Sequence, residues 1–136
     1  MKSFRRKGTS WHYNDTLNLT VDQWKTLLSS SEIFNEEALW MLRFVYHEPN
    51  HQSCASEIGL ALGGFTQQKI TSMNRKISKQ IYDYYDQIPP NETNGGLRYW
   101  NVVFDGNPGK ERNRVGHFFW RLRPNLVIAL EALQLI

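Results

Sequence analysis

The stretch SCASEIGLALGGFTQQKITSMNRKISK, residues 53–79, decides the fold. Apolar side chains recur at helical spacing over residues 53–62, and Ser53 in front of them is a good N-cap, so we expect a short helix there. Gly63-Gly64 follows directly and supplies the positive-φ backbone that commonly closes a helix. The stretch therefore opens with a short helix and a tight turn.

A longer helix follows that turn. Thr66 is its expected N-cap, and the helix should run from Gln67 to about Asp86. Its apolar face is formed by Ile70, Met73, Ile77, Ile81 and Tyr84. The remaining faces are polar or basic. A short helix, a glycine turn and a longer helix with a polar side together predict a helix-turn-helix.

Three further helices flank this unit. Thr20 is the expected N-cap of the first helix and Asn35 that of the second. The apolar stripe of the second helix is wide enough to be mostly buried, and Pro49 ends it. The last helix begins at Pro124, where the missing N–H of proline costs nothing.

The hydrophobic period changes from 3.6 to 2 after the loop at residues 89–96. Residues 98–104 and 117–123 each alternate apolar and polar side chains, and the glycine-rich segment 105–116 separates them, so we expect a β-hairpin with a long loop. A hairpin directly after a helix-turn-helix is typical of a winged helix. The expected fold is therefore mainly α with a β-hairpin (α+β): a winged helix-turn-helix of about five helices and a two-stranded wing.

The length of 136 residues corresponds to one domain, 19–136, preceded by a basic and aromatic arm at 1–18. No stretch approaches the ~20 apolar residues of a membrane helix. The basic start is followed by no apolar stretch, so no signal peptide is expected. The single cysteine, Cys54, which we expect to be half-buried, excludes an internal disulfide and a multi-cysteine zinc site. It favours a reducing, cytoplasmic location.

The net charge is only +3, but the basic residues are unevenly distributed. Residues 1–68 carry six Lys/Arg against seven Asp/Glu, whereas residues 69–136 carry ten against six. Within 98–123 the count is six against two. A local cationic excess of this kind is typical of a polyanion-binding surface, although a solvated basic loop has the same composition.

The polar side of the longer helix carries residue types that suit duplex DNA. A helix fits the B-DNA major groove, where Gln pairs with the N6/N7 edge of adenine and Arg with O6/N7 of guanine or with a phosphate. Backbone N–H groups at the helix N-terminus also meet phosphates. An ordinary amphipathic helix with a solvated side is the alternative. The candidate DNA-binding residues of this helix are Thr66, Gln67, Gln68, Lys69, Thr71, Ser72, Arg75, Lys76 and Lys79.

The hairpin loop places cations next to glycines, which allow close approach to a phosphate backbone. A soluble hairpin turn without a ligand is the alternative. The candidate DNA-binding residues of the hairpin are Lys110, Arg112, Asn113 and Arg114 at the tip, and His117, Arg121 and Arg123 on the polar face of its second strand.

The aromatic residues divide into two groups. Those at periodic positions are expected in the core: Trp24, Trp40, Trp100, Phe104, Phe118 and Trp120. Rings outside the apolar stripes have a second use, because they can stack on an unpaired or flipped base. These are Trp11, Tyr13, Tyr85, Tyr99 and Phe119.

No pattern in the sequence predicts catalysis. His47 and His51 are four residues apart, but Pro49 and Asn50 break the helix that would align them on a metal. Cys54 has no adjacent His or Asp that would activate it. Walker-type, GxGxxG and GxSxG motifs are missing. We therefore expect neither enzymatic activity nor a metal or cofactor.

Residues 99–130 resemble a known class of module. The stretch Tyr99-Trp100-Asn101-Val102-Val103-Phe104-Asp105-Gly106, followed by Gly116-His117-Phe118-Phe119-Trp120-Arg121-Leu122-Arg123-Pro124-Asn125-Leu126 and then Ala129-Leu130, is similar to small winged-helix-like modules in bacterial restriction proteins. Such modules stand beside nuclease or GTP-driven motor domains, in HNH-type and modification-dependent enzymes among others. A weaker similarity runs through residues 53–58 and the helix after them. The resemblance implies a DNA-targeting module, with a modified base as one class of target.

Three functions remain open at this point. The leading expectation is a non-catalytic module that binds double-stranded DNA and targets a restriction-type system, together with a nuclease or motor subunit or domain. The second is a free-standing transcriptional regulator of the winged-helix type, dimerising through the end of the last helix at residues 133–136. The third is a protein–protein adaptor with the same fold, which holds its partner through the aromatic arm.

Overall fold

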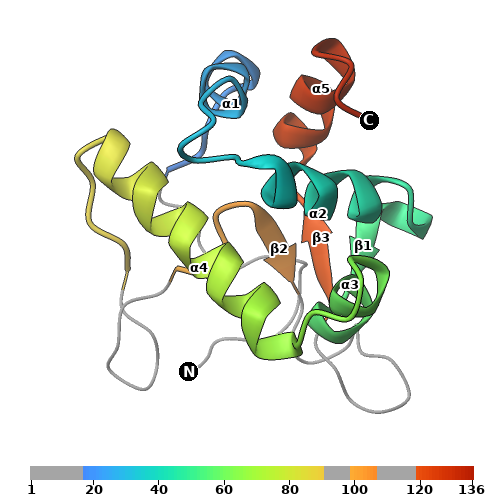
Figure 1. Ribbon diagram of the computed structural model, residues 1–136. Helices are drawn as coiled ribbons and strands as arrows, with labels where there is room; N and C mark the ends of the chain where they lie inside the picture. Colours follow the sequence, from blue (N-terminus) through green and yellow to red (C-terminus); the bar gives the residue numbers. More distant parts are fainter. Residues whose placement is uncertain (1–16, 91–98, 107–118) are drawn as a thin grey trace, which may run out of the picture.

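The computed structural model describes residues 17–90, 99–106 and 119–136. In these residues, five α-helices and a small three-stranded antiparallel sheet form the fold (Figure 1). The helices are α1 (Val21–Leu28), α2 (Glu36–Tyr46), α3 (Ala55–Ala61), α4 (Gln67–Tyr84) and α5 (Pro124–Ala132). The strands are β1 (Gln52–Ser53), β2 (Phe104–Gly106) and β3 (Trp120–Leu122), and a 3-10 turn, η1 (Pro49–His51), precedes β1. The expected mainly helical α+β class is confirmed.

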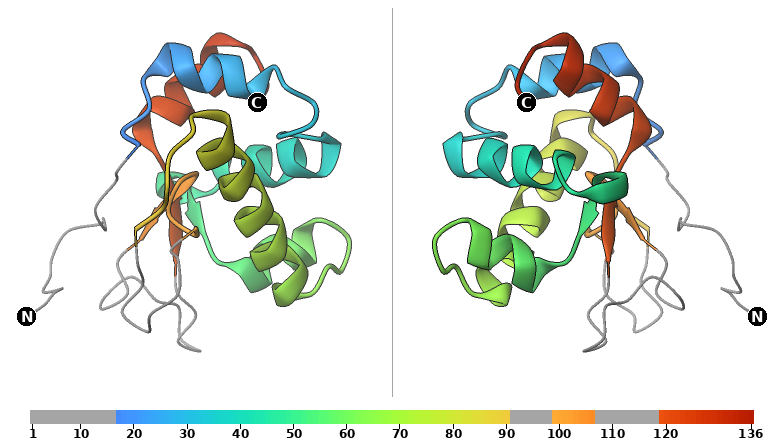
Figure 2. Two further views of the ribbon diagram at one scale, coloured as in Figure 1. Left: turned by 90° about the vertical axis from the view of Figure 1, so that its left-hand side faces the viewer. Right: turned by 90° about the vertical axis from the view of Figure 1, so that its right-hand side faces the viewer.

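The two ends of the molecule are built differently. α1 and α5 pack against each other at one end, at the top of both views in Figure 2. α3 packs on α4 and on α2, and α2 also lies against β3. β3 is the central strand, with β1 on one side and β2 on the other. The N-terminal end of α4 and the end of the hairpin where Gly106 pairs with Trp120 both lie toward the lower end of the views.

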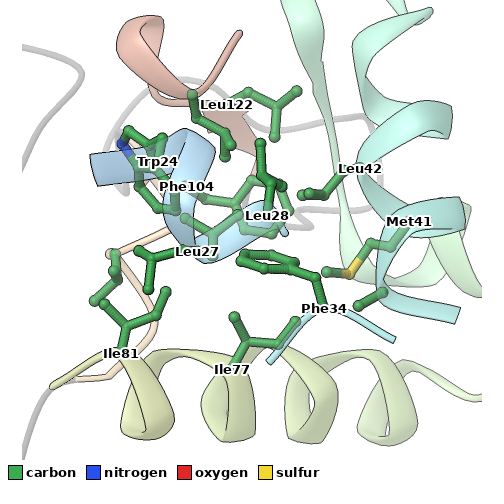
Figure 3. Packing of buried hydrophobic residues seen from close by; sticks show 14 of the residues in the cluster. Trp24, Leu27, Leu28, Phe34, Met41, Leu42, Ile77, Ile81, Phe104 and Leu122 are labelled. Carbon is green, nitrogen blue, oxygen red and sulfur yellow. The ribbon is translucent and has the colours of Figure 1, made fainter. Parts of the chain in front are cut away.

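The core lies between α1, α2, α4 and the hairpin (Figure 3). Each large apolar side chain that is fully buried there stabilises the fold by about 1.5–3 kcal/mol. Because α4 contributes to this core along its inner face, the opposite face of the helix is held toward solvent. The labelled core residues are Trp24, Leu27, Leu28, Phe34, Met41, Leu42, Ile77, Ile81, Phe104 and Leu122.

Three helix starts follow the sequence signals closely. Thr20 and Gln23 form a reciprocal capping box at the start of α1. Asn35 Oδ1 accepts a hydrogen bond of 2.9 Å from the third backbone N–H of α2. Thr66 Oγ1 accepts one of 3.1 Å at the same position of α4. Each cap contributes about 1 kcal/mol, and all three predicted caps are confirmed.

The turn between α3 and α4 is tight for two reasons. Gly63 and Gly64 have φ values of +103° and +91°, a conformation that L side chains rarely adopt. The backbone N–H groups of Gly64 and Phe65 both donate to the carbonyl oxygen of Gly59, at 3.0 and 2.9 Å. A Cβ on Gly59 would lie 2.2 Å from the Phe65 carbonyl oxygen. Gly59, Gly63 and Gly64 therefore allow the start of α4 to lie in close contact with the end of α3.

The start of α3 differs from the prediction. Ser53 is not its N-cap but belongs to β1, where it pairs with Trp120. Cys54 occupies the N-cap position without a side-chain cap bond, and it is fully buried rather than half-buried. A two-residue strand is too short to show a hydrophobic period, so β1 has no signal in the sequence.

The end of α4 also differs. The helix stops at Tyr84, because Asp86 takes a positive φ of 53°. Tyr84 is exposed, whereas Tyr82, which was not expected on the apolar face, is buried. Two polar side chains, Asn74 and Ser78, are buried on the same inner face. The inner face is therefore wider and more polar than the periodicity indicates.

The first strand of the hairpin is shorter than expected. Residues 100–103 form turns, and β2 begins only at Phe104. Val102, Val103 and Phe104 are all buried, so burial does not alternate there. β3 keeps the predicted alternation, with its two apolar residues buried and the intervening Arg121 partly exposed. The antiparallel hairpin itself is confirmed.

Most of the aromatic residues assigned to the core are found there. Trp24, Phe104 and Trp120 are buried, and Trp100 is partly buried. Trp40 is instead 42% exposed, so its assignment to the core is wrong. The wide apolar stripe of α2 extends past the part of the helix that the other elements cover.

Candidate nucleic-acid interface

The polar side of α4 faces solvent along its whole length. All nine candidate residues of this helix and its cap are exposed: Thr66, Gln67, Gln68, Lys69, Thr71, Ser72, Arg75, Lys76 and Lys79. None of them is drawn into the core, which α4 contacts through its opposite face. All nine side chains are therefore accessible from solvent.

Four of these residues form a line, which we call the α4 stripe. Gln68, Ser72, Arg75 and Lys79 follow a spacing of four, three and four residues, which places them on one side of a helix with 3.6 residues per turn. At 1.5 Å per residue the line is about 16 Å long. α4 carries four Lys/Arg residues and one acidic residue, Asp83, near its end. The stripe is thus polar and cationic.

Two residues at the start of α4 are engaged by the protein itself. The Thr66 hydroxyl accepts the cap hydrogen bond. Lys69 Nζ lies 4.6 Å from the centroid of the Phe65 ring and 3.8 Å from Glu37 Oε1 on α2. Both partners of this ion pair are exposed, so it contributes at most about 1 kcal/mol and a stronger anion can displace it.

Arg75 lies beside the segment that leads into β2. Its Cζ atom is 5.1 Å from the centroid of the Tyr99 ring. Tyr99 packs edge-on against Tyr82 of α4, with 5.9 Å between ring centroids. Asn74 Nδ2 donates to the Trp100 carbonyl oxygen at 2.9 Å. Residues 99–100 are therefore attached to α4 directly next to the α4 stripe.

The two described arginines of the hairpin differ in exposure. Arg121 is about one-third exposed and lies 3.9 Å from Asp105, its partner in the strand register. Arg123 is buried, lies 3.7 Å from Asp105 and donates to the Asn101 carbonyl oxygen. Arg123 therefore holds the base of the hairpin together, and its assignment to the DNA surface is corrected. Arg121 keeps its place on the polar face.

The remaining candidates lie outside the described residues. The hairpin candidates among them, Lys110, Arg112, Asn113, Arg114 and His117, belong to the segment between Gly106 and Phe119. The aromatic candidates Trp11 and Tyr13 and the expected core residue Phe118 also lie outside. The end of the sheet where Gly106 of β2 pairs with Trp120 of β3 lies toward the same end of the molecule as the start of α4 (Figure 2).

A shallow groove lies on another part of the surface. It has a volume of about 580 Å³ and is mostly apolar. Its lining residues come from α2 and from the α3–α4 turn: Trp40, Arg43, Phe44, His47, Ala61, Leu62 and Gly63. Sequence reasoning missed this groove because it assigned Trp40 to the core.

The two histidines at spacing four have structural surroundings. His51 Nδ1 lies 2.6 Å from the Tyr46 carbonyl oxygen, and its ring stacks on the Tyr46 ring at 4.6 Å. His47 meets the same ring edge-on. Within residues 17–90, 99–106 and 119–136, no group of three His, Cys, Asp or Glu side chains is placed to hold a metal ion.

A hydrogen bond also joins α2 to α5. Tyr46 Oη donates to Glu131 Oε2 at 2.6 Å. This bond raises the pKa of Tyr46 above its ordinary value of 10.0, and burial and the charge of Glu131 act in the same direction. The contact is far from the α4 stripe in sequence and belongs to the packing of the two helices.

Comparison of the chain with protein-family models, with curated proteins and with solved structures finds no match. In the part of the chain that the structure describes, no helix is both long enough and apolar enough to cross a membrane.

Proposed function

We propose that this chain is a winged helix-turn-helix module that binds double-stranded DNA without catalysing a reaction on it. In this proposal α4 enters the major groove and the hairpin loop contacts the phosphate backbone or an adjacent groove. The observation that carries the proposal is the solvent exposure of every candidate residue on α4. The restriction-type setting suggested by the resemblance is part of the proposal.

The order of the elements supports a winged helix. α2, β1, α3, the glycine turn, α4 and the β2–β3 hairpin follow one another along the chain, and β1 completes the sheet beside β3. The helix of a helix-turn-helix that reads DNA is the second one, which here is α4. Its inner face is anchored in the core, so a rigid helix presents the α4 stripe.

The charges of the proposed interface set its salt dependence. Lys76 and Lys79 on α4 and Lys110, Arg112 and Arg114 in the hairpin loop provide about five phosphate contacts. Each contact contributes a slope of about −0.9 to log K against log [salt], so we expect a slope of about −4.5. Between 50 and 200 mM salt the affinity should then fall by about 500-fold.

Fluorescence anisotropy with a labelled duplex tests this directly. We expect the triple variant Lys110→Ala, Arg112→Ala, Arg114→Ala to lower the slope by about 2.7, and Lys79→Ala to lower it by about 0.9. Lys25→Ala on α1 is the matched control and should leave the slope unchanged. Absence of binding at low salt, or binding that does not respond to salt, would refute the proposal.

The same assay addresses the target. One duplex sequence is compared in unmodified, cytosine-methylated and adenine-methylated forms. Tighter binding to one methylated form supports a modification-dependent restriction setting, and equal binding to all three argues against it. A dimer in sedimentation experiments with two half-sites on the DNA would favour the regulator. A protein partner that DNA fails to displace would favour the adaptor.

A further inference from the structure

The contact between Arg75 and Tyr99 stands out among the cations of α4. Arg75 is exposed, yet its guanidinium lies over an aromatic ring 5.1 Å away. Lys76 and Lys79, the two cations that follow on the helix, have no ring contact or ion pair among the described residues. Of these three cations, Arg75 is therefore the one that contacts another side chain among the described residues.

The ring that holds Arg75 is itself fixed to α4. Tyr99 packs edge-on against the buried Tyr82, and the backbone next to it is tied to α4 by the Asn74–Trp100 hydrogen bond of 2.9 Å. Asn74 is only 1% exposed, so this hydrogen bond is shielded from water. Tyr99 thus occupies a fixed site on the flank of the α4 stripe.

The contact leaves the hydrogen-bonding groups of Arg75 available. A ring that lies against a guanidinium interacts with its charge and its face, whereas the five N–H donors point outward in its plane. Among the described residues, no hydrogen bond or salt bridge engages these donors. A planar pair of N–H donors on a guanidinium matches O6 and N7 of guanine, which lie on the major-groove edge of a base pair.

We propose that Arg75 reads a guanine in the major groove and that Tyr99 is the positioning residue that holds its guanidinium for this contact. The inference rests on the proposed duplex binding and names the base that the α4 stripe recognises. Tyr99 also belongs to the segment that leads into β2, so it links Arg75 on α4 to the base of the hairpin. The exposed Lys76 and Lys79 then bind the phosphates.

Binding selection from a randomised duplex library, followed by affinity measurements on the selected site, tests the proposal. For the wild-type chain we expect one required G·C pair. Arg75→Ala should lose about 5- to 150-fold in affinity for that pair and show no preference at that position. Replacing the guanine by 7-deazaguanine, which lacks N7 but pairs normally, should weaken wild-type binding and leave Arg75→Ala unaffected.

The role of Tyr99 needs variants that separate positioning from folding. Tyr99→Phe keeps the ring and should retain the preference for guanine. Tyr99→Leu loses the cation–π contact and should lower the affinity about 2- to 5-fold, with the loss confined to the guanine position. Tyr84→Leu, which removes an exposed ring from the same helix, is the control and should change nothing.

The outcomes distinguish the two proposals. If the wild-type chain binds duplex DNA but Arg75→Ala keeps every base preference, the guanine assignment is wrong and duplex binding stands. If Tyr99→Leu weakens binding equally to all sequences, or Tyr99→Phe fails to rescue, the positioning role is wrong. If the wild-type chain does not bind a duplex at low salt, duplex binding itself is refuted.

Discussion

The closeness of α3 to the turn before α4 predicts a large effect of one methyl group. In Gly59→Ala the new Cβ would lie 2.2 Å from the Phe65 carbonyl oxygen. This oxygen is a backbone atom, so it cannot move away by a change of side-chain rotamer. Helix propensity alone favours the change, because alanine is about 1 kcal/mol better than glycine inside a helix. The two effects have opposite signs, so the measurement decides between them.

The steric effect is the larger of the two. Overpacking of this kind costs about 1–3 kcal/mol. Relief of this clash moves Gly59 of α3 away from the turn at residues 63–65. That movement weakens the two hydrogen bonds that Gly64 and Phe65 donate to Gly59, each worth about 1 kcal/mol. With the propensity gain subtracted, Gly59→Ala should destabilise the protein by about 3 kcal/mol.

Urea unfolding followed by tryptophan fluorescence measures this difference. With a slope of about 1.5 kcal/mol/M, the midpoint should fall by about 2 M. Leu60→Ala, at the neighbouring position of α3 and 77% exposed, is the control and should change stability by less than about 0.5 kcal/mol. If Gly59→Ala is as stable as the wild type or more stable, the tight α3–α4 turn described above is incorrect.

Three further changes test other parts of the structure. Asp105→Asn removes the charge that faces the buried Arg123, and it should lower the free energy of unfolding by about 3 kcal/mol in thermal unfolding. This value is at the low end for a buried ion pair because the contact is 3.7 Å long. An unchanged melting temperature would show that the pair is not formed. Thr66→Ala removes the cap of α4 and should cost about 1 kcal/mol in urea, whereas Thr66→Ser should cost little. The pKa of Tyr46 is raised above 10.0 by its hydrogen bond to Glu131, so the stability from this bond is fully present below pH 10 and is lost as the pH rises through the raised value. Unfolding measured from pH 9 upward should show this loss in the wild type and not in Tyr46→Phe.

The sequence predicts those features of the fold whose cause is local. The caps at Thr20, Asn35 and Thr66 bond to residues three positions away, and the turn at the positive-φ glycines 63 and 64 is closed by bonds that span five and six positions. The cap side chains bond to backbone N–H groups of the first helical turn, so a short window of sequence contains the whole interaction. The exposed side of α4 follows from its period in the same way.

The features that the sequence does not predict depend on distant partners. β1 exists because Gln52 and Ser53 pair with β3, almost seventy positions away. Arg123 is buried because Asp105 and the Asn101 carbonyl oxygen meet it across the hairpin, and nothing in the alternation of β3 distinguishes it from Arg121. Pairing across a sheet overrides local propensity in both cases.

The contact between Arg75 and Tyr99 belongs to the second group. The sequence predicts a role for each residue separately: Arg75 as a cation that contacts guanine or phosphate, and Tyr99 as a ring outside the apolar stripes. Only the structure places them together, through the attachment of residues 99–100 to α4. Their contact supports a role for Tyr99 in positioning Arg75, which differs from the base stacking that the sequence predicts for this ring.

The location of the proposed duplex on the surface can be measured most directly by NMR. Titration of the 15N-labelled chain with a short duplex should shift the backbone amides of the α4 stripe, Gln68, Ser72, Arg75 and Lys79, and those at the Gly106–Trp120 end of the hairpin. The amides of α1 and α5, at the opposite end of the molecule, should not move. Shifts confined to α1 and α5, or no shifts with any duplex at low salt, would contradict the assignment of α4 as the DNA-binding helix.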